Sequence, residues 1–224
     1  MISENILQFL KELSGNNNRE WYHANKHKYA TAKKDFESFV NIAIYEISQF
    51  DDQINALSAG DCIFRIFRDT RFSNDKTPYK TNMGAFIAKG GRKSGYAGYY
   101  IHVDPAGSFL AGGVYMPPSP ILKLIRQEIY NFTDEFKKII QDKKFVQHFG
   151  KLIDENKLKG APRGYSKDFA DIDLLKYTSY TVFKNETEAM IRSNDFIGEV
   201  KEVFTTMKPL NHFLNRAIDE GQNS

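Results

Sequence analysis

The central part of the chain, residues 61–115, alternates apolar or aromatic residues with other residues at a period close to two. Four short runs show this pattern, separated by polar, glycine and proline segments: CIFRIF, MGAFIA, YAGYYIHV and SFLAGGVY. A period of two places alternate side chains on opposite faces of a β-strand. DPAG, between the last two runs, has proline and glycine at favourable turn positions. Short connections of this kind join antiparallel neighbours, so the region predicts an antiparallel meander.

Helical periodicity flanks this region on both sides. Before it, apolar residues recur every three or four positions from Ile6 to Leu13 and from Phe36 to Ile47. After it, we expect one short strand over Tyr177–Phe183 and helices that begin near Ser119 and then cover Thr133–Ile140, Lys143–Phe149, Glu186–Ile191, Asp195–Met207 and Pro209–Ile218. This order predicts an α+β fold, with about four or five strands packed against N-terminal and C-terminal helices.

The chain is expected to form a single domain over residues 1–224 in the cytoplasm. Its hydrophobic content of 41% is ample for one core, and no repeat or long linker divides it. No apolar run approaches the roughly 18 residues that cross a bilayer, and the N-terminus has no basic leader. The single cysteine, Cys62, excludes an internal disulfide and agrees with a reducing compartment, where it is most simply a small buried strand residue. We predict no cofactor and no metal site.

Positive charge is concentrated in one stretch, FRIFRDTRFSNDKTPYK, from Phe64 to Lys80. It carries net +3, as much as the whole chain. A guanidinium held on a strand can bind a carboxylate or phosphate through two parallel hydrogen bonds. The alternative is structural: Arg65 or Arg68 pairs with Asp69 or Asp75 and organises the loop. The spacing favours neither interpretation over the other.

The same stretch carries a family resemblance. RIFRDTRFSNDKTPYKTNMGAFI, with GYYIHVDPAGSFLAGGVYMP and the later LKGAPRGY, resembles the bacterial family called domain of unknown function 2461. The likeness runs from about Trp21 to Ile218. It implies a shared site in the central motif and no activity, since no biochemical role comes with the family.

A ligand site is predicted around this motif. LKGAPRGY is a glycine and proline loop with two basic residues, a second candidate wall for the site. The predicted ligand-binding residues are Arg65, Arg68, Arg71, Lys76, Tyr79, Lys80, Lys159 and Arg163. The expected ligand is a small anion, phosphorylated or a carboxylate.

Two other functions stay open from sequence. The first is an enzyme in which Asp69, Tyr79 or His102 moves a proton while arginines stabilise negative charge. Tyr100, His102 and Asp104 alternate on one strand face and could act together in this way. A histidine that is hydrogen-bonded for structural reasons is the simpler interpretation. The second is nucleic-acid binding, with Phe64–Lys80, Lys89–Lys93 and Lys157–Lys167 as one basic surface. The chain's formal net charge of only +3 does not favour it. The oligomeric state is open.

Overall fold

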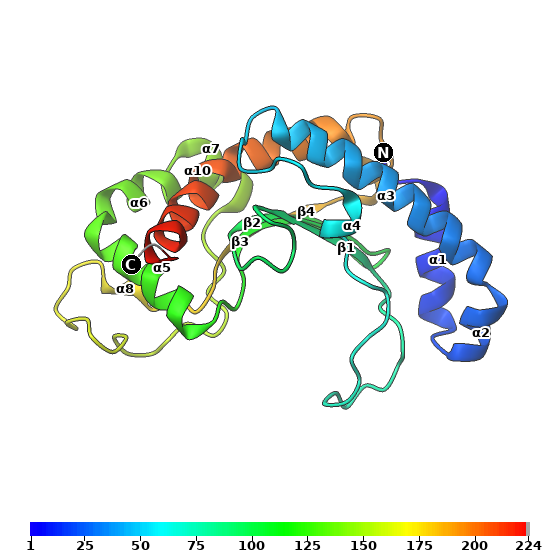
Figure 1. Ribbon diagram of the computed structural model, residues 1–224, viewed down its shortest axis with the longest axis horizontal. Coiled ribbons are helices and arrows are strands. Elements are labelled where there is room, and N and C mark those ends of the chain that lie inside the picture. Colours follow the sequence, from blue (N-terminus) through cyan, green and yellow to red (C-terminus); the bar gives the residue numbers. More distant parts are fainter. Residues whose placement is uncertain (223–224) are drawn as a thin grey trace.

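The computed structural model describes residues 1–222 as a four-stranded antiparallel sheet with helices packed on one face (Figure 1). The strands follow the order β1-β2-β3-β4 and cover Met83–Ala88 (β1), Gly98–Val103 (β2), Ser108–Val114 (β3) and Tyr180–Glu186 (β4). The helices are Glu4–Gly15 (α1), Arg19–Ala24 (α2), Lys26–Ser48 (α3), Ala59–Cys62 (α4), Ser119–Asn131 (α5), Thr133–Ile140 (α6), Lys143–Phe149 (α7), Ile172–Leu175 (α8), Glu188–Arg192 (α9) and Phe196–Gln222 (α10). The predicted α+β fold is confirmed.

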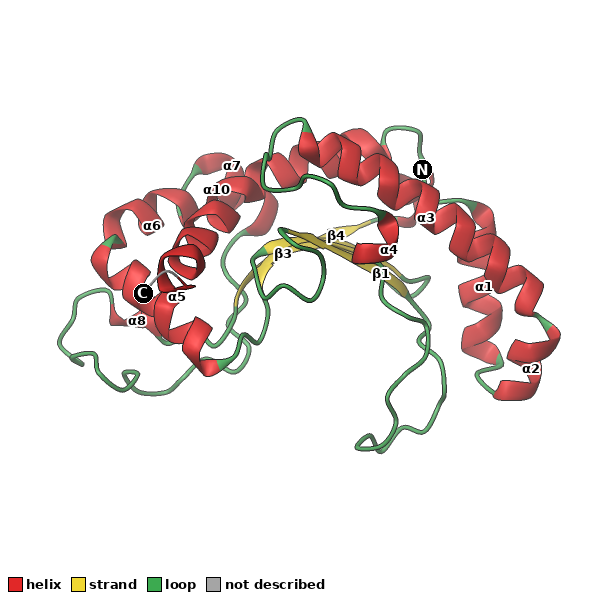
Figure 2. Ribbon diagram, viewed as in Figure 1, coloured by secondary structure: helices red, strands yellow, loops and turns green. Residues whose placement is uncertain are grey.

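The two faces of the sheet have different environments. Along β2, Tyr99, Ile101 and Val103 are completely buried, whereas Tyr100 and His102 between them are only partly buried. The buried set faces the helices, because the Tyr99 ring packs on Phe204 of α10 with centroids 5.0 Å apart. Figure 1 shows α3 and α10 on this side of the sheet. In the same view no described helix lies below the centre of the sheet (Figure 2).

The glycines of β3 allow helix α10 and the neighbouring strand β4 to approach the β3 backbone closely. A Cβ at Gly112 would lie 2.6 Å from the sulfur of Met207, so α10 packs directly on the backbone here. A Cβ at Gly113, where φ is +105°, would lie 2.0 Å from the Tyr180 carbonyl oxygen of β4. The AGGVYMPP segment therefore has glycines where neighbouring groups leave no room for a side chain.

The first expected strand, CIFRIF, is not a regular strand. Cys62 ends the short helix α4, and only Ile63 and Phe67 form isolated bridges, with Ala85 and Tyr79. The fourth strand of the sheet is instead β4, which the sequence placed at Tyr177–Phe183 and which lies at 180–186. Cys62 is buried as expected, and burial raises the pKa of its thiol to about 11.

The expected helix break before Pro209 does not occur. α10 continues through this proline, although proline has no N–H to donate to the preceding turn. Met207, Leu210 and Leu214 of the same helix are completely buried. Burial of this continuous apolar face offsets the lost hydrogen bond.

Within residues 1–222, none of the helices combines the length and the apolar character that crossing a membrane requires.

Candidate functional site

The basic motif folds into a two-limbed ribbon that projects from the β1 edge of the sheet. We call residues 63–80 the basic ribbon. Its limbs are joined by backbone hydrogen bonds from Lys80 N–H to the Ile66 carbonyl (2.8 Å) and from Arg68 N–H to the Pro78 carbonyl (3.0 Å). Figure 1 shows the ribbon on the side of the sheet away from α3 and α10. The motif therefore borders the sheet face that helices leave open.

Two of the three arginines in the ribbon are neutralised within it. Arg68 donates hydrogen bonds to Asp75 and Thr77, which closes the loop at the tip. Arg71 donates to both carboxylate oxygens of Asp69, at 3.0 and 2.7 Å. These hydrogen bonds lower the pKa of Asp69 and of Asp75 to about 2. For these two arginines, the structure agrees with the structural interpretation of the motif.

Arg65 and Lys80 have no such partner. Among residues 1–222, neither is within hydrogen-bond or salt-bridge distance of a carboxylate. Arg65 is exposed, and the Lys80 ammonium lies 5.2 Å from the centre of the Phe64 ring. Burial, and then the positive charge of Arg65, lower the pKa of Lys80. The charge of Arg65 also helps to lower the pKa of Asp69, although the two side chains form no hydrogen bond or salt bridge. Lys80 thus lies over Phe64 at one end of the open sheet face, with Arg65 near enough to lower its pKa.

The remaining ribbon candidates have other roles in the structure. Tyr79 is 3% exposed and stacks on Tyr22 of α2 with centroids 4.1 Å apart, so it packs in the core between the ribbon and the N-terminal helices. Burial raises its pKa. Lys76 is exposed and donates to the Thr70 carbonyl at 2.9 Å.

Lys159 and Arg163 do not join the ribbon. Both are exposed on the segment between α7 and α8. In Figure 1 this segment lies near α5 and α8, at the opposite end of the molecule from α1 and α2, and is well separated from the ribbon. The structure therefore keeps the two predicted walls of the site apart.

Aromatic rings cover the open sheet face next to the ribbon. The register of the strands places alternate residues on this face, from Gly84 of β1 through His102 of β2 and Phe109 of β3. A row of four rings crosses it with successive centroids 6.2, 5.8 and 6.2 Å apart: Phe64, Tyr100, Phe109 and Phe183. Phe64 and Phe183, at the two ends, are 38% and 43% exposed. Large rings left this accessible on a sheet mark a surface able to bind flat apolar groups.

His102 links the aromatic row to the cations. Its Nδ1 is 3.0 Å from the Tyr100 hydroxyl, its Nε2 is 3.9 Å from Asp104, and its ring stacks on Phe109 at 4.3 Å. Gly84 makes this arrangement possible, because a Cβ there would lie 2.5 Å from the Tyr100 hydroxyl oxygen. The alternation of Tyr100, His102 and Asp104 in the sequence predicted this group, and the structure brings the three side chains together.

The pKa of His102 is lowered in the folded protein. Burial is the main cause; the Asp104 carboxylate opposes it, and the Lys80 charge adds to it. Burial also raises the pKa of Tyr100 to about 12, so its phenol keeps its proton and can donate to the neutral imidazole. Of the three acid–base candidates, only His102 lies on the open face beside Lys80. Asp69 is paired with Arg71 near the ribbon tip, and Tyr79 is in the core.

The lowered pKa of His102 predicts a pH-dependent stability. The unfolded chain, with a histidine pKa near 6.5, takes up the proton before the folded chain does as the pH falls. The neutral form of His102 therefore contributes fully to the stability of the folded state above pH 6.5. This contribution is lost as the pH falls through the pKa that His102 has in the folded protein, which is lower than 6.5. We expect urea unfolding at a series of pH values to show a smaller loss of stability on acidification in His102→Gln than in the wild type. Parallel pH profiles for the two proteins would contradict this expectation.

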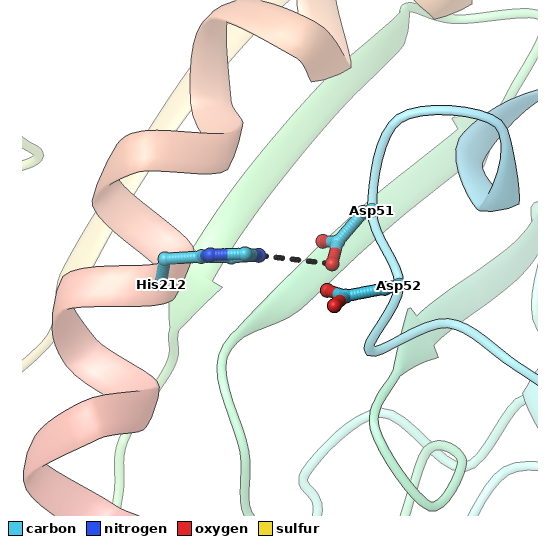
Figure 3. Close-up of side chains that lie close together, drawn as sticks. All are labelled: Asp51, Asp52 and His212. Atoms are coloured by element: carbon cyan, nitrogen blue, oxygen red, sulfur yellow. Dashed lines mark hydrogen bonds and ion pairs between the residues drawn. The ribbon is translucent and has the colours of Figure 1, made fainter.

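A second cluster of ionisable groups lies on the helical side of the sheet. Asp51, Asp52 and His212 have their ligand-type atoms within 4.8 Å of one another (Figure 3). This is a donor set that can hold a divalent cation. However, Asp51 is already satisfied by hydrogen bonds from the Tyr99 hydroxyl (2.6 Å), from His212 (2.9 Å) and from the Gln53 N–H (3.1 Å). These bonds join the end of α3 to β2 and α10. No local pattern distinguishes His212 in the sequence, because its partner is 161 residues away.

A cavity on the helical side also lies away from the open face. It has a volume of about 1020 Å³ and is lined by residues of α6, α7 and α10. Its charged lining holds more acids than bases, apart from His212: Glu135, Asp142, Glu202, Asp219 and Glu220 against Lys138, Lys144 and Arg216. This balance disfavours an anion there.

The fold and site define an α+β protein whose antiparallel sheet has helices on one face and an aromatic, basic surface on the other. The chain belongs to the DUF2461 family, described as conserved hypothetical proteins, whose family model matches residues 5–213. The resemblance found in the sequence is confirmed. Comparison with curated proteins and with solved structures gives no match.

Proposed function

We propose that the protein binds a small anionic ligand, phosphorylated or a carboxylate, where the basic ribbon meets the open sheet face. The observation that supports this is the pair Arg65 and Lys80. Arg68 and Arg71 each form a salt bridge with a carboxylate of the ribbon, whereas Arg65 and Lys80 form none. Arg65 and Lys80 also lie close enough together for the charge of Arg65 to lower the pKa of Lys80. An anion between them would relieve this repulsion and accept charge-assisted hydrogen bonds.

The rings beside the cations strengthen the proposed site. Lys80 lies over Phe64, and the Phe64 ring lies 6.2 Å from the ring of Tyr100, which contacts His102. An anion bound at Lys80 would therefore lie between the ribbon and the Tyr100–His102 pair. Because both partners are ionised, each such hydrogen bond is stronger than one between neutral groups.

The test is a thermal-shift screen of inorganic phosphate, phosphorylated sugars and carboxylates against three variants. Ligand binding stabilises the folded wild type by RT ln(1 + [L]/Kd), so its melting temperature rises with the ligand concentration. We expect Lys80→Met, which keeps an apolar stem over Phe64, and Arg65→Gln to lose the shift. Each should weaken binding by roughly 10-fold or more, the value of one charged hydrogen bond.

Arg71→Gln is the matched control, because Arg71 is 78% exposed and already paired with Asp69. It should keep the wild-type response. The proposal fails if no anion class stabilises the wild type, or if Arg71→Gln loses the response as fully as Lys80→Met.

Catalysis on the bound anion is a second candidate, favoured by the contact between Tyr100 and His102. A neutral imidazole with a lowered pKa is ready to accept a proton. Any compound that binds in the screen would be incubated with the wild type and with His102→Gln, and its products followed by mass spectrometry. Conversion by the wild type alone supports this role, and equal conversion, or none by either protein, contradicts it.

A further inference from the structure

We propose that the open sheet face binds single-stranded nucleic acid, with bases stacked on the aromatic row and backbone phosphates on Lys80 and Arg65. This inference rests on the proposed anion site and names the partner that carries the anion. Of the three basic segments that the sequence suggested as one surface, it uses only Phe64–Lys80, together with the aromatic row. Lys89 of the middle segment pairs with Asp219 of α10, and Arg92 donates to the Gly60 carbonyl.

The geometry of the rings supports an extended ligand with several flat groups. The row runs across the ribbon, β2, β3 and β4, with one ring on each and nearly even spacing of about 6 Å between centroids. Neighbouring rings are tilted by 54° to 76°, and His102 already stacks on Phe109, so the accessible end rings Phe64 and Phe183 are where bases would stack. Four-stranded antiparallel sheets with exposed aromatic rings can stack two or three successive bases.

The shape of the surface agrees with a strand rather than a small molecule. Phe64 and Phe183, the two ends of the row, are the most exposed of its rings. Because the rings at both ends are accessible to solvent, a chain can enter the row at one end and leave it at the other.

The charges on this face are complementary to a phosphate backbone at one end of the row. Arg65 and Lys80 are beside Phe64, and the tip of the ribbon adds Lys76. The Asp104 carboxylate, whose side chain is 15% exposed, lies 3.9 Å from His102. Stacked bases with phosphates held at one edge are the general arrangement of single-strand binding surfaces.

The test is fluorescence anisotropy with fluorescein-labelled single strands of about ten nucleotides, one of thymidylate and one of uridylate. We expect at least one to bind the wild type, with affinity that falls as salt rises. Phe183→Ala should bind roughly 5- to 150-fold more weakly, the usual effect of losing one stacking ring. Phe183 is 43% exposed, so the variant should fold.

Tyr45→Ala is the matched control, because Tyr45 is also an accessible ring (61% exposed) but lies on α3, in the helical layer. It should bind as the wild type does. Absence of binding by both strands would overturn the inference, as would equal affinities of Phe183→Ala and Tyr45→Ala.

The outcomes separate this inference from the proposed function. If phosphate or a sugar phosphate stabilises the wild type through Lys80 while the oligonucleotides do not bind, the anion site stands and the single-strand inference is wrong. If an unlabelled duplex of the same length competes as well as the unlabelled single strand, base stacking is not the mode of binding and the inference is also wrong. If neither anions nor oligonucleotides bind, both proposals fail.

Discussion

Gly113→Ala is expected to destabilise the protein by about 3 to 5 kcal/mol. The residue has φ of +105°, where any side chain other than hydrogen is strained, and its Cβ would lie 2.0 Å from the Tyr180 carbonyl oxygen. That oxygen belongs to the backbone of β4, so relief requires β3 and β4 to move apart. Guanidinium unfolding followed by circular dichroism measures the change.

Gly107→Ala is the control for this change. Gly107 ends the DPAG turn, has no heavy atom within 4 Å of an added Cβ, and should tolerate alanine within about 0.5 kcal/mol. If Gly113→Ala were as stable as Gly107→Ala, the close pairing of β3 with β4 at this point would be wrong.

Asp51→Ala is expected to cost about 2 to 4 kcal/mol. The Asp51 carboxylate is 2% exposed and accepts from the Tyr99 hydroxyl, which is completely buried and would lose this partner. His212 would lose its partner as well. An unpaired buried donor costs more than the hydrogen bond contributes, so the loss is large. Urea unfolding at pH 7.5 measures it.

Asp52→Ala separates the hydrogen-bonded interpretation of this cluster from a metal site. Asp52 is exposed, and a hydrogen-bonded tie through Asp51 predicts a change within about 0.5 kcal/mol. A bound cation would use both carboxylates. The hydrogen-bonded interpretation would be contradicted if Asp52→Ala lost as much unfolding free energy as Asp51→Ala. It would also have to be the case that this difference between Asp52→Ala and the wild type disappears when a chelator is added to both proteins.

The basic motif illustrates why charge in a sequence does not identify a site by itself. Arg68 and Arg71 hold the ribbon in shape through carboxylates a few residues away. These local pairs could be suspected from spacing, because Asp69 and Asp75 lie within the motif. Which arginine would remain without a partner depends on the limb pairing, which turns Arg65 toward solvent and leaves Lys80 over Phe64.

The acid–base candidates show the same limit. His102 could be placed with Tyr100 and Asp104 because a strand of period two sets their common face. Tyr79 was a candidate by its position between Lys76 and Lys80, yet it stacks on Tyr22 of α2. A local pattern carries no information about a helix that packs on it from another part of the chain.

The sequence alone determined the elements whose signal is local. Apolar spacing located the helices at both ends, period two located β1, β2 and β3, and the DPAG turn made two of them neighbours. Those patterns depend on residues within a few positions of one another, so they can be read without the fold. Tertiary structure decided the rest: β4 as the fourth strand, the continuity of α10 through Pro209, the Asp51–His212 tie and the row of rings. Each of these depends on contacts between segments far apart in the chain, where burial of apolar surface outweighs local preference.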